Sequence, residues 1–180
     1  MLRAAAAALA VAALAAPSDA GARGARPGRR SMVVLDGERV PVRWTDGDTF
    51  RILGGRLAGR AARLSGVNAL ETYGPVHRWA GISPWALLAV AKAAAPLAAR
   101  EVRRCEDQGR DDVYGRLLAS CPDAALALVE AGDAMVFAVD APADERLLAA
   151  QRRAQAARLG IWAGGAPPLV PTSLHSADEP

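Results

Sequence analysis

The 180-residue sequence has few aromatic residues, two cysteines and two histidines. Aromatic side chains make up 4% of the chain, so we expect a core of Leu, Val and Ile with a few Trp anchors. No CxxC pair and no Cys/His cluster occurs, which argues against a structural zinc site. After the first residues no apolar run approaches the length that spans a bilayer. The length suits one domain with a proper core better than two.

The charge balance is only mildly basic. The formal net charge is +3, which slightly favours a polyanionic partner. Several arginines lie in the leading segment, outside the region expected to fold. The net charge therefore does not by itself identify a nucleic-acid-binding protein.

The N-terminus is typical of a secretory signal peptide. Met1, Leu2 and Arg3 give a short positive start, and residues 4–16 form an apolar run too short to span a bilayer. An uncleaved anchor or a disordered arm is the alternative. We divide the chain into a signal peptide (1–20), a basic linker (21–31), a folded domain (32–163) and a Pro-rich tail (164–180). The mature protein is expected to be exported to the periplasm or secreted, soluble and without a membrane partner.

Both cysteines, Cys105 and Cys121, lie within the region expected to fold. In an exported chain an even pair favours a disulfide. Residues 100–106 and 116–121 read as the two strands of a hairpin that would place the cysteines opposite each other. Such a bridge should stabilise the domain by roughly 3 kcal/mol in the chain-entropy model. The alternative is two buried free thiols.

The first half of the domain has the alternating pattern of short strands, and the second half adds helices. Strands are expected at 33–35, 39–44, 49–53, 61–67, 100–106, 116–121 and 134–139. Their length and spacing indicate a small barrel or meander. Helices are expected from Ser83 and Pro84 until Pro96 ends or kinks the helix, at 124–131 between Asp123 and Gly132, and at 143–158 with Gly160 as its cap and Trp162 packing on the core.

Charged residues in the first half fit a site that grips a phosphodiester beside a divalent cation. Asp48 begins a strand, and Gly47 allows a backbone bend that would point this carboxylate into a cleft. Hard cations such as calcium bind oxygens from more than one segment, and Glu71 is a second source. Arg63 and Arg116 begin strands, and the planar guanidinium fork matches phosphate oxygens. Glu71 would then position or deprotonate an attacking water.

The order of these motifs resembles the thermonuclease family, the staphylococcal-nuclease-like enzymes, over residues 40–162. The matching pieces are Asp46-Gly47-Asp48-Thr49, Arg63-Leu64, Val67 to Glu71, Tyr73-Gly74-Pro75, Asp112, Tyr114-Gly115-Arg116 and Leu159-Gly160-Ile161-Trp162. The resemblance implies an OB-fold, a five-stranded β-barrel with three α-helices. It also implies calcium-dependent cleavage of DNA or RNA, with Asp48 as a calcium ligand and Glu71 as base or water-orienting group. Arg63 and Arg116 would contact the scissile phosphate.

Some positions depart from the family pattern. Asn68 stands where the family has a second metal carboxylate, so it would coordinate calcium through its amide oxygen and bind it more weakly. The base-stacking tyrosines of the family are replaced in the segment 137–140. His77 is interpreted as a surface residue rather than a ligand. Trp79 and Trp85 are interpreted as core residues rather than stacking platforms.

The sequence thus supports two hypotheses. The first is an exported, monomeric nuclease that cleaves DNA or RNA with a single calcium ion held by Asp48 and Asn68. The second is a catalytically impaired OB-fold module that binds nucleic acid or another partner through the same face. The enzyme is favoured by the joint retention of Asp48, Arg63, Glu71 and Arg116. A binding module needs no carboxylate aimed at the phosphate, because the carboxylate would repel the ligand.

Overall fold

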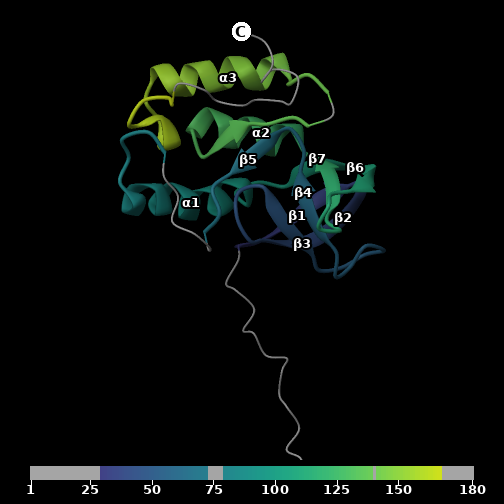
Figure 1. Cartoon of the computed structure of the whole chain (residues 1–180). Helices are drawn as coiled ribbons and strands as arrows, with labels where there is room; N and C mark the ends of the chain where they lie inside the picture. Colours follow the sequence, from purple (N-terminus) through teal and green to yellow (C-terminus); the bar gives the residue numbers. More distant parts are fainter. Residues whose placement is uncertain (1–28, 73–78, 140, 168–180) are drawn as a thin grey trace, which may run out of the picture.

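A computed structural model describes residues 29–72, 79–139 and 141–167 (Figure 1). The predicted signal peptide, most of the linker, most of the tail and His77 lie outside these residues. No helix within the described ranges is long and apolar enough to cross a membrane. The first strand begins at Arg29, so it includes the last residues of the predicted linker.

Six strands close into a barrel in the order β1-β2-β3-β4-β7-β6. They are β1 (Arg29–Leu35), β2 (Glu38–Trp44), β3 (Thr49–Ile52), β4 (Ala61–Leu64), β6 (Arg103–Asp111) and β7 (Leu117–Ser120). The predicted barrel with three helices is confirmed, and it closes with six strands rather than the five implied. Strand β1, expected at 33–35, lies between β2 and β6 and pairs antiparallel with β2 and parallel with β6.

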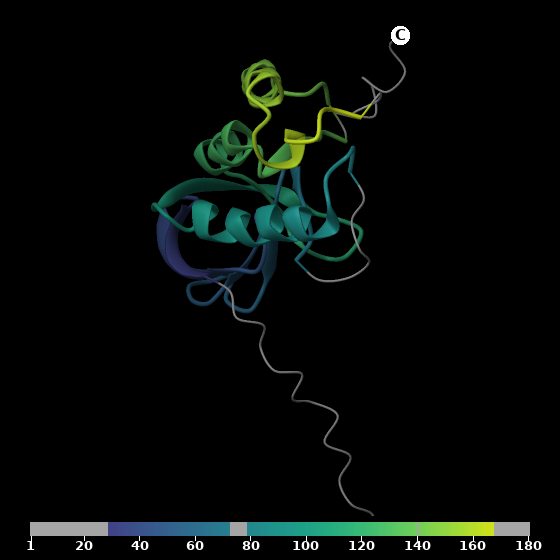
Figure 2. The same ribbon diagram turned by 90° about the vertical axis from the view of Figure 1, so that its left-hand side faces the viewer.

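The remaining elements pack around the barrel (Figures 1 and 2). They are β5 (Val67–Ala69), which pairs with β8 (Ala134–Val136), and the helices α1 (Pro84–Ala98), α2 (Pro122–Ala131) and α3 (Glu145–Ala156). In the view of Figure 1, α2 and α3 lie above the barrel and α1 lies beside it. In both views α2 lies between α3 and the barrel. A short 3₁₀ turn, Gly160–Trp162, follows α3. Helix α3 therefore faces the barrel across α2.

Helix ends agree with the sequence in part. Ser83 caps α1 as expected, its hydroxyl accepting from the Ala86 N–H at 3.3 Å. Pro96 does not end α1, because it lies in the last turn and the helix continues to Ala98, whose side chain is buried. Cys121, rather than Asp123, precedes α2, since Pro122 takes the first helical position.

The end of α3 also differs from the prediction. Ala157, rather than Gly160, caps this helix. Gly160 instead meets the backbone of Gly132, where a β-carbon would overlap the Gly132 carbonyl. Gly132 ends α2 in the left-handed conformation, as expected. Because neither residue has a side chain, the segment after α3 can pass close to the α2–β8 turn.

The core contains most of the expected aliphatic side chains and two tryptophan anchors. Trp44 packs on Phe50 with ring centroids 4.8 Å apart inside the barrel. Trp162 is fully buried and meets Trp79 at 5.5 Å, so both pack as predicted in a smaller cluster beside the helices. Trp85 does not, because its side chain is 81% exposed at the start of α1.

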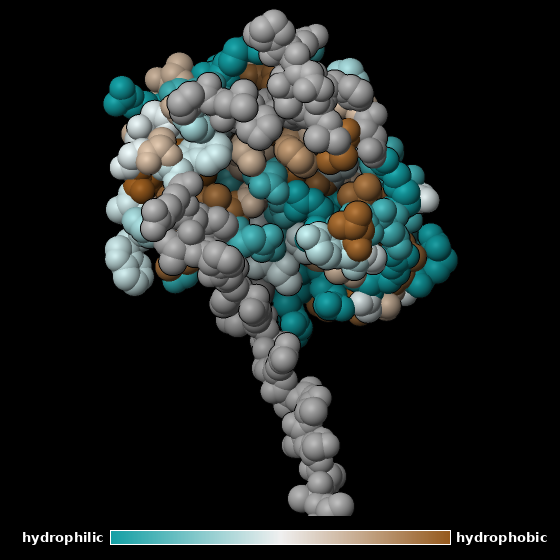
Figure 3. Space-filling model, in the orientation of Figure 1, coloured by the Kyte–Doolittle hydropathy of each residue, from teal (hydrophilic) through white to brown (hydrophobic). Residues whose placement is uncertain are grey.

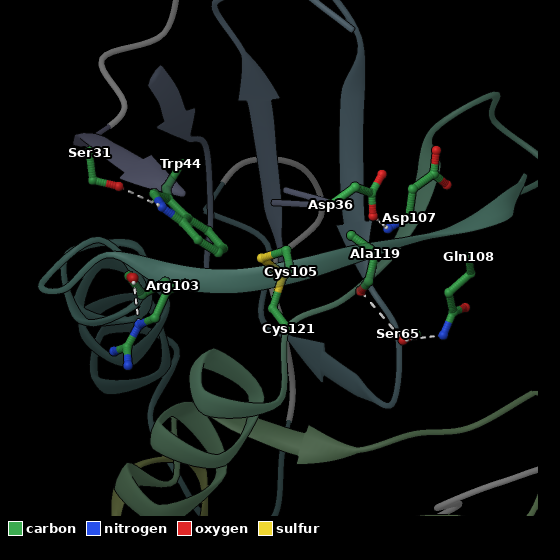
Figure 4. Close-up of a disulfide and its surroundings, with 11 residues drawn as sticks. Ser31, Asp36, Trp44, Ser65, Arg103, Cys105, Asp107, Gln108, Ala119 and Cys121 are labelled. Atoms are coloured by element: carbon green, nitrogen blue, oxygen red, sulfur yellow. Dashed lines mark hydrogen bonds between the residues drawn. A yellow bond between two sulfur atoms is a disulfide. The ribbon is translucent and has the colours of Figure 1, made fainter. Parts of the chain in front are cut away.

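The predicted disulfide between Cys105 and Cys121 is present (Figure 4). The hairpin register that pairs Glu106 with Ser120 brings the two cysteines side by side. Both are buried, and the bridge ties the start of β6 to the start of α2. It therefore joins the barrel to the helical layer.

Candidate active site

The Asp46-Gly47-Asp48 loop between β2 and β3 is fixed by a local turn and by close packing. The Asp46 carboxylate accepts from the Asp48 backbone N–H at 3.1 Å, an arrangement typical of an Asx turn. Gly47 does not have the positive φ of a sharp glycine bend. A β-carbon on Gly47 would instead lie 2.6 Å from the Ala94 β-carbon and 2.8 Å from that of Ala69. Glycine is needed here because α1 and β5 approach the backbone so closely.

Asp48 is the centre of the site. Its side chain is 2% exposed, and its Oδ2 accepts from Arg63 Nη1 at 2.9 Å and from the Ala69 N–H at 2.8 Å. The second Arg63 nitrogen, Nη2, donates to Asn68 Oδ1 at 2.7 Å. One guanidinium therefore bridges the two residues that the sequence nominated as calcium ligands. The Asp48 and Asn68 side-chain oxygens both contact this guanidinium.

Arg116 joins the same group from the other side. Its Nε donates to Asp112 Oδ2 at 2.7 Å, and its Nη1 donates to the Thr49 hydroxyl at 3.3 Å. The Thr49 hydroxyl in turn donates to Asp48 Oδ1 at 3.0 Å. The Arg116 guanidinium also lies 5.4 Å from the centre of the Tyr114 ring. A continuous chain of polar contacts thus runs from Asp112 to Asp48.

Asp112 anchors Arg116 as a charged residue. Burial alone would raise the pKa of its carboxyl, but hydrogen bonds from Arg116 and Tyr114 and the Arg116 charge lower it below its usual value. The carboxylate also accepts from the backbone N–H groups of Tyr114 and Arg116, both at 2.9 Å. Asp112 therefore fixes both the turn before β7 and the arginine that follows this turn.

Negative charge is concentrated around Asp46. Burial, and then the charges of Asp48 and Glu71, raise the pKa of the Asp46 carboxyl to about 7. Asp46 is buried, whereas Glu71 is exposed to solvent. Three carboxyl groups from two segments thus influence one another, and a cation placed among them would relieve their repulsion.

The donor set fits a divalent cation of the calcium type, but modestly. Carboxylate and amide oxygens are hard donors, and those of Asp48 and Asn68 both lie against the Arg63 guanidinium. Among the described residues, no group of three or more His, Cys, Asp or Glu side chains is arranged to hold a metal ion. Such a site would have one carboxylate and one amide, so its affinity would be lower than that of a site with two carboxylates.

The structure brings the predicted site residues together, with Glu71 connected to the others through its charge. Arg63, Arg116, Asp48 and Asn68 form one contact network, and Glu71 acts on it through its charge on Asp46. Sequence reasoning did not assign a role to the Thr49 hydroxyl, which links Arg116 to Asp48. Its signal was the position directly after Asp48, on the outer face of the strand.

A sequence profile of staphylococcal nuclease homologues matches residues 61–164, more than half of the chain. The chain belongs to the staphylococcal nuclease homologue family. A search of curated proteins found no match. Within the family match lie Arg63, Asn68, Glu71 and Arg116, whereas Asp46 and Asp48 precede it. The fold therefore adds the carboxylates of the β2–β3 loop to the matched part of this staphylococcal nuclease homologue.

The surface around the site has few aromatic side chains. Tyr114 and Val113, at the tip of the β6–β7 hairpin, are 81% and 92% exposed. Val139 is 46% exposed in the segment that follows β8. Figure 3 shows brown hydrophobic residues scattered among teal hydrophilic ones on the face viewed in Figure 1. Among the described residues, Tyr114 is an exposed aromatic ring that contacts the site, through Arg116.

Proposed function

We propose that this protein is an exported nuclease that hydrolyses phosphodiester bonds of DNA or RNA with one divalent cation, calcium. The supporting observation is the pair of guanidinium groups, Arg63 and Arg116, connected through Asp48 and Thr49. Arg63 lies on β4, and Arg116 directly precedes the neighbouring strand β7, whose Leu118 pairs with Arg63. Two positioned forks suit the equatorial oxygens of a phosphorane-like transition state.

Each residue has a defined task in this proposal. Asp48 and Asn68 would hold the cation, which when bound supplies charge stabilisation and favours ionisation of water. Glu71 orients the attacking water or accepts its proton. Arg63 donates to Asp48, Asn68 and the Val67 carbonyl through its two terminal nitrogens. Within the described residues its Nε–H makes no hydrogen bond, so we assign this donor to a phosphate oxygen. Arg116 contacts a second phosphate oxygen while Asp112 holds its Nε.

The proposal includes export and an independent, monomeric mode of action. The buried disulfide supports an oxidising compartment, because such bridges persist outside the cytosol. Residues 1–20 would be removed as a signal peptide, leaving the domain predicted at 32–163 with its tail. DNA or RNA is then met in the periplasm or outside the cell.

The contact between Arg63 and both nominated ligands favours a second candidate function. A guanidinium that bridges Asp48 and Asn68 supplies a positive charge at the point where a cation would bind. A protein locked in this arrangement would bind nucleic acid without cleaving it. The two candidates differ in whether calcium enters the site and in whether the Glu71 carboxylate is needed.

Cleavage of single-stranded DNA by the purified mature protein, with and without calcium, tests the enzyme. We expect calcium-dependent cleavage that falls about a thousandfold in Glu71→Gln. The matched control is Glu145→Gln, an exposed glutamate at the start of α3, which should cleave normally. No cleavage at millimolar calcium, or full activity in Glu71→Gln, would reject the proposed chemistry and leave the binding module.

Calorimetric titration with calcium tests the ligand set separately from activity. Asn68→Asp restores a second carboxylate beside Asp48, so we expect binding about tenfold tighter than in the wild type. The new carboxylate would still accept the hydrogen bond that Arg63 now donates to Asn68. Arg63 and calcium would therefore compete for it. An unchanged calcium affinity would place residue 68 outside the metal site.

A further inference from the structure

The outer faces of β1 and β2 carry basic and apolar side chains. Inward positions of these strands, such as Val33, Val40 and Val42, are buried in the barrel. The alternate, outward positions hold six residues, all of them within the described ranges: Arg30, Met32, Val34, Arg39, Pro41 and Arg43. Half of these are arginine and none is acidic. This face is therefore cationic although the net charge of the chain is small.

The strand register aligns three arginines across neighbouring strands. Arg30 of β1 pairs with Arg43 of β2, and Arg43 pairs with Arg51 of β3. Neighbouring strands lie about 4.8 Å apart, so the backbone positions of the outer two are about 10 Å apart. We call these three residues the arginine row. Arg39 and Arg104 flank it, since both pair with Val34.

The positive charges of the arginine row are not balanced by carboxylates within the described residues. Within the described part of the chain, Arg30 and Arg43 make no ion pair and no side-chain hydrogen bond. Arg51 donates to the Gly59 carbonyl at 2.7 Å, which is a dipole rather than a countercharge. Like charges directly opposite on adjacent strands disfavour the pairing. A bound polyanion would reduce the repulsion between these arginines.

The arginine row is continuous with the candidate active site. Arg51 and Thr49 both lie on β3 two residues apart, which corresponds to about 7 Å along the strand. Thr49 pairs with Arg63 on β4 and contacts Arg116. A chain of phosphates that passes the active site can therefore continue over the arginine row within two or three nucleotides.

We propose that the arginine row binds the phosphate backbone of a nucleic acid strand, independently of its base sequence. The contacts would be electrostatic, and each bound phosphate would release condensed counterions. The choice of a nucleic acid as the polyanion rests on the proposed function. Binding itself needs neither the metal nor cleavage, because the arginine row lies outside the residues assigned to the chemistry.

The test is the salt dependence of binding to a fluorescein-labelled oligothymidylate of 20 nucleotides, followed by fluorescence anisotropy in a metal chelator. The variant is the double substitution R30Q/R43Q, which keeps the Arg51 contact to Gly59. We expect weaker binding, and a slope of log K against log salt concentration that is shallower by about 1.4, near 0.7 for each phosphate that is no longer neutralised.

Two matched variants separate charge from structure. R152Q/R158Q removes the same charge from exposed positions on and just after α3, far from the arginine row, and should keep the wild-type slope. R30K/R43K keeps the charge and should retain most of the wild-type slope. Circular dichroism confirms that each variant is folded.

Three results would overturn the inference: an unchanged slope in R30Q/R43Q, an equally shallow slope in R152Q/R158Q, or no recovery in R30K/R43K. Because the chelator removes calcium, the outcome does not depend on nuclease activity. A protein that binds through the arginine row but never cleaves would refute the proposed enzyme and keep this surface.

Discussion

Two arginine-bearing faces of the same barrel treat their charges in opposite ways. Around the candidate active site, Arg63 is tied to Asp48 and Arg116 to Asp112, both through contacts shorter than 3 Å. Across β1, β2 and β3 the arginines face one another, with no carboxylate partner within the described residues. The arginines of the site are paired with carboxylates, whereas those of the arginine row are not.

This contrast indicates what each face is suited to do. Paired guanidinium groups are held in fixed directions, as chemistry at one phosphate requires. Opposed guanidinium groups keep freedom to follow a flexible backbone, which suits sequence-independent binding. Buried acids show the same contrast, since Asp48 has Arg63 beside it and Asp133 has no basic partner in the described part of the chain.

Within the comparison of the two arginine-bearing faces, the strongest effect should be on cleavage, after substitution of an arginine that is paired with a carboxylate. Arg63→Lys keeps the charge beside Asp48 but loses the planar fork, so we expect the cleavage rate to fall about a hundredfold. Arg152→Lys, on the exposed face of α3, should cleave like the wild type. Steady-state rates on single-stranded DNA measure both. A fully active Arg63→Lys would mean that geometry at this arginine does not matter.

The next effect is on stability through the unpaired acid. Burial raises the pKa of the Asp133 carboxyl to about 6, above its unfolded value of 3.8. As the pH rises, the carboxyl loses its proton in the unfolded chain before it does so in the folded protein, which favours unfolding. The free energy of unfolding therefore falls between about pH 4 and pH 6 and stays low above pH 6. Asp133→Asn should be more stable than the wild type at pH 7 by about 2 kcal/mol.

Urea unfolding of the wild type and Asp133→Asn at pH 4 and pH 7 measures this difference. The two proteins should differ little at pH 4, where Asp133 is largely protonated when folded. A difference that is equal at both pH values would show that the carboxyl does not titrate as its burial implies.

An effect of similar size is expected from crowding the loop that carries Asp48. Gly47→Ala would place its β-carbon 2.6 Å from that of Ala94, so we expect the unfolding free energy to fall by about 2 kcal/mol. Gly81→Ala is the control, because its nearest neighbour would be 3.9 Å away. Thermal unfolding compares them. Equal stability of the two variants would mean that α1 yields to the added methyl group.

The weakest effect compares two adjacent acids of the β6–β7 hairpin. Asp112→Asn removes the charge that holds Arg116 Nε, so we expect cleavage about tenfold slower. Asp111→Asn removes a pair with Arg60 in which the Asp111 and Arg60 side chains are 46% and 38% exposed, and should change little. Equal losses of rate in the two variants would show that the partner of Arg116 matters no more than the partner of the exposed Arg60.

Much of the fold followed from local patterns. Alternation predicted the barrel strands, Ser83 and Pro84 predicted the start of α1, and the hairpin spacing predicted the disulfide. Where local rules failed, packing prevailed. Pro96 stays inside α1 because only its last turn is affected, and Gly160 serves a close backbone approach rather than a helix cap.

The chemical groups of the site could be read from the sequence alone: two arginines, the Asp48 and Glu71 carboxylates, and an amide at Asn68. The short-strand barrel could be read as well, because residue alternation and turn residues act locally. That one guanidinium bridges Asp48 and Asn68, and that three arginines form a row, emerged only from the tertiary structure. Both depend on strand register, which joins residues distant along the chain and leaves no trace in local periodicity.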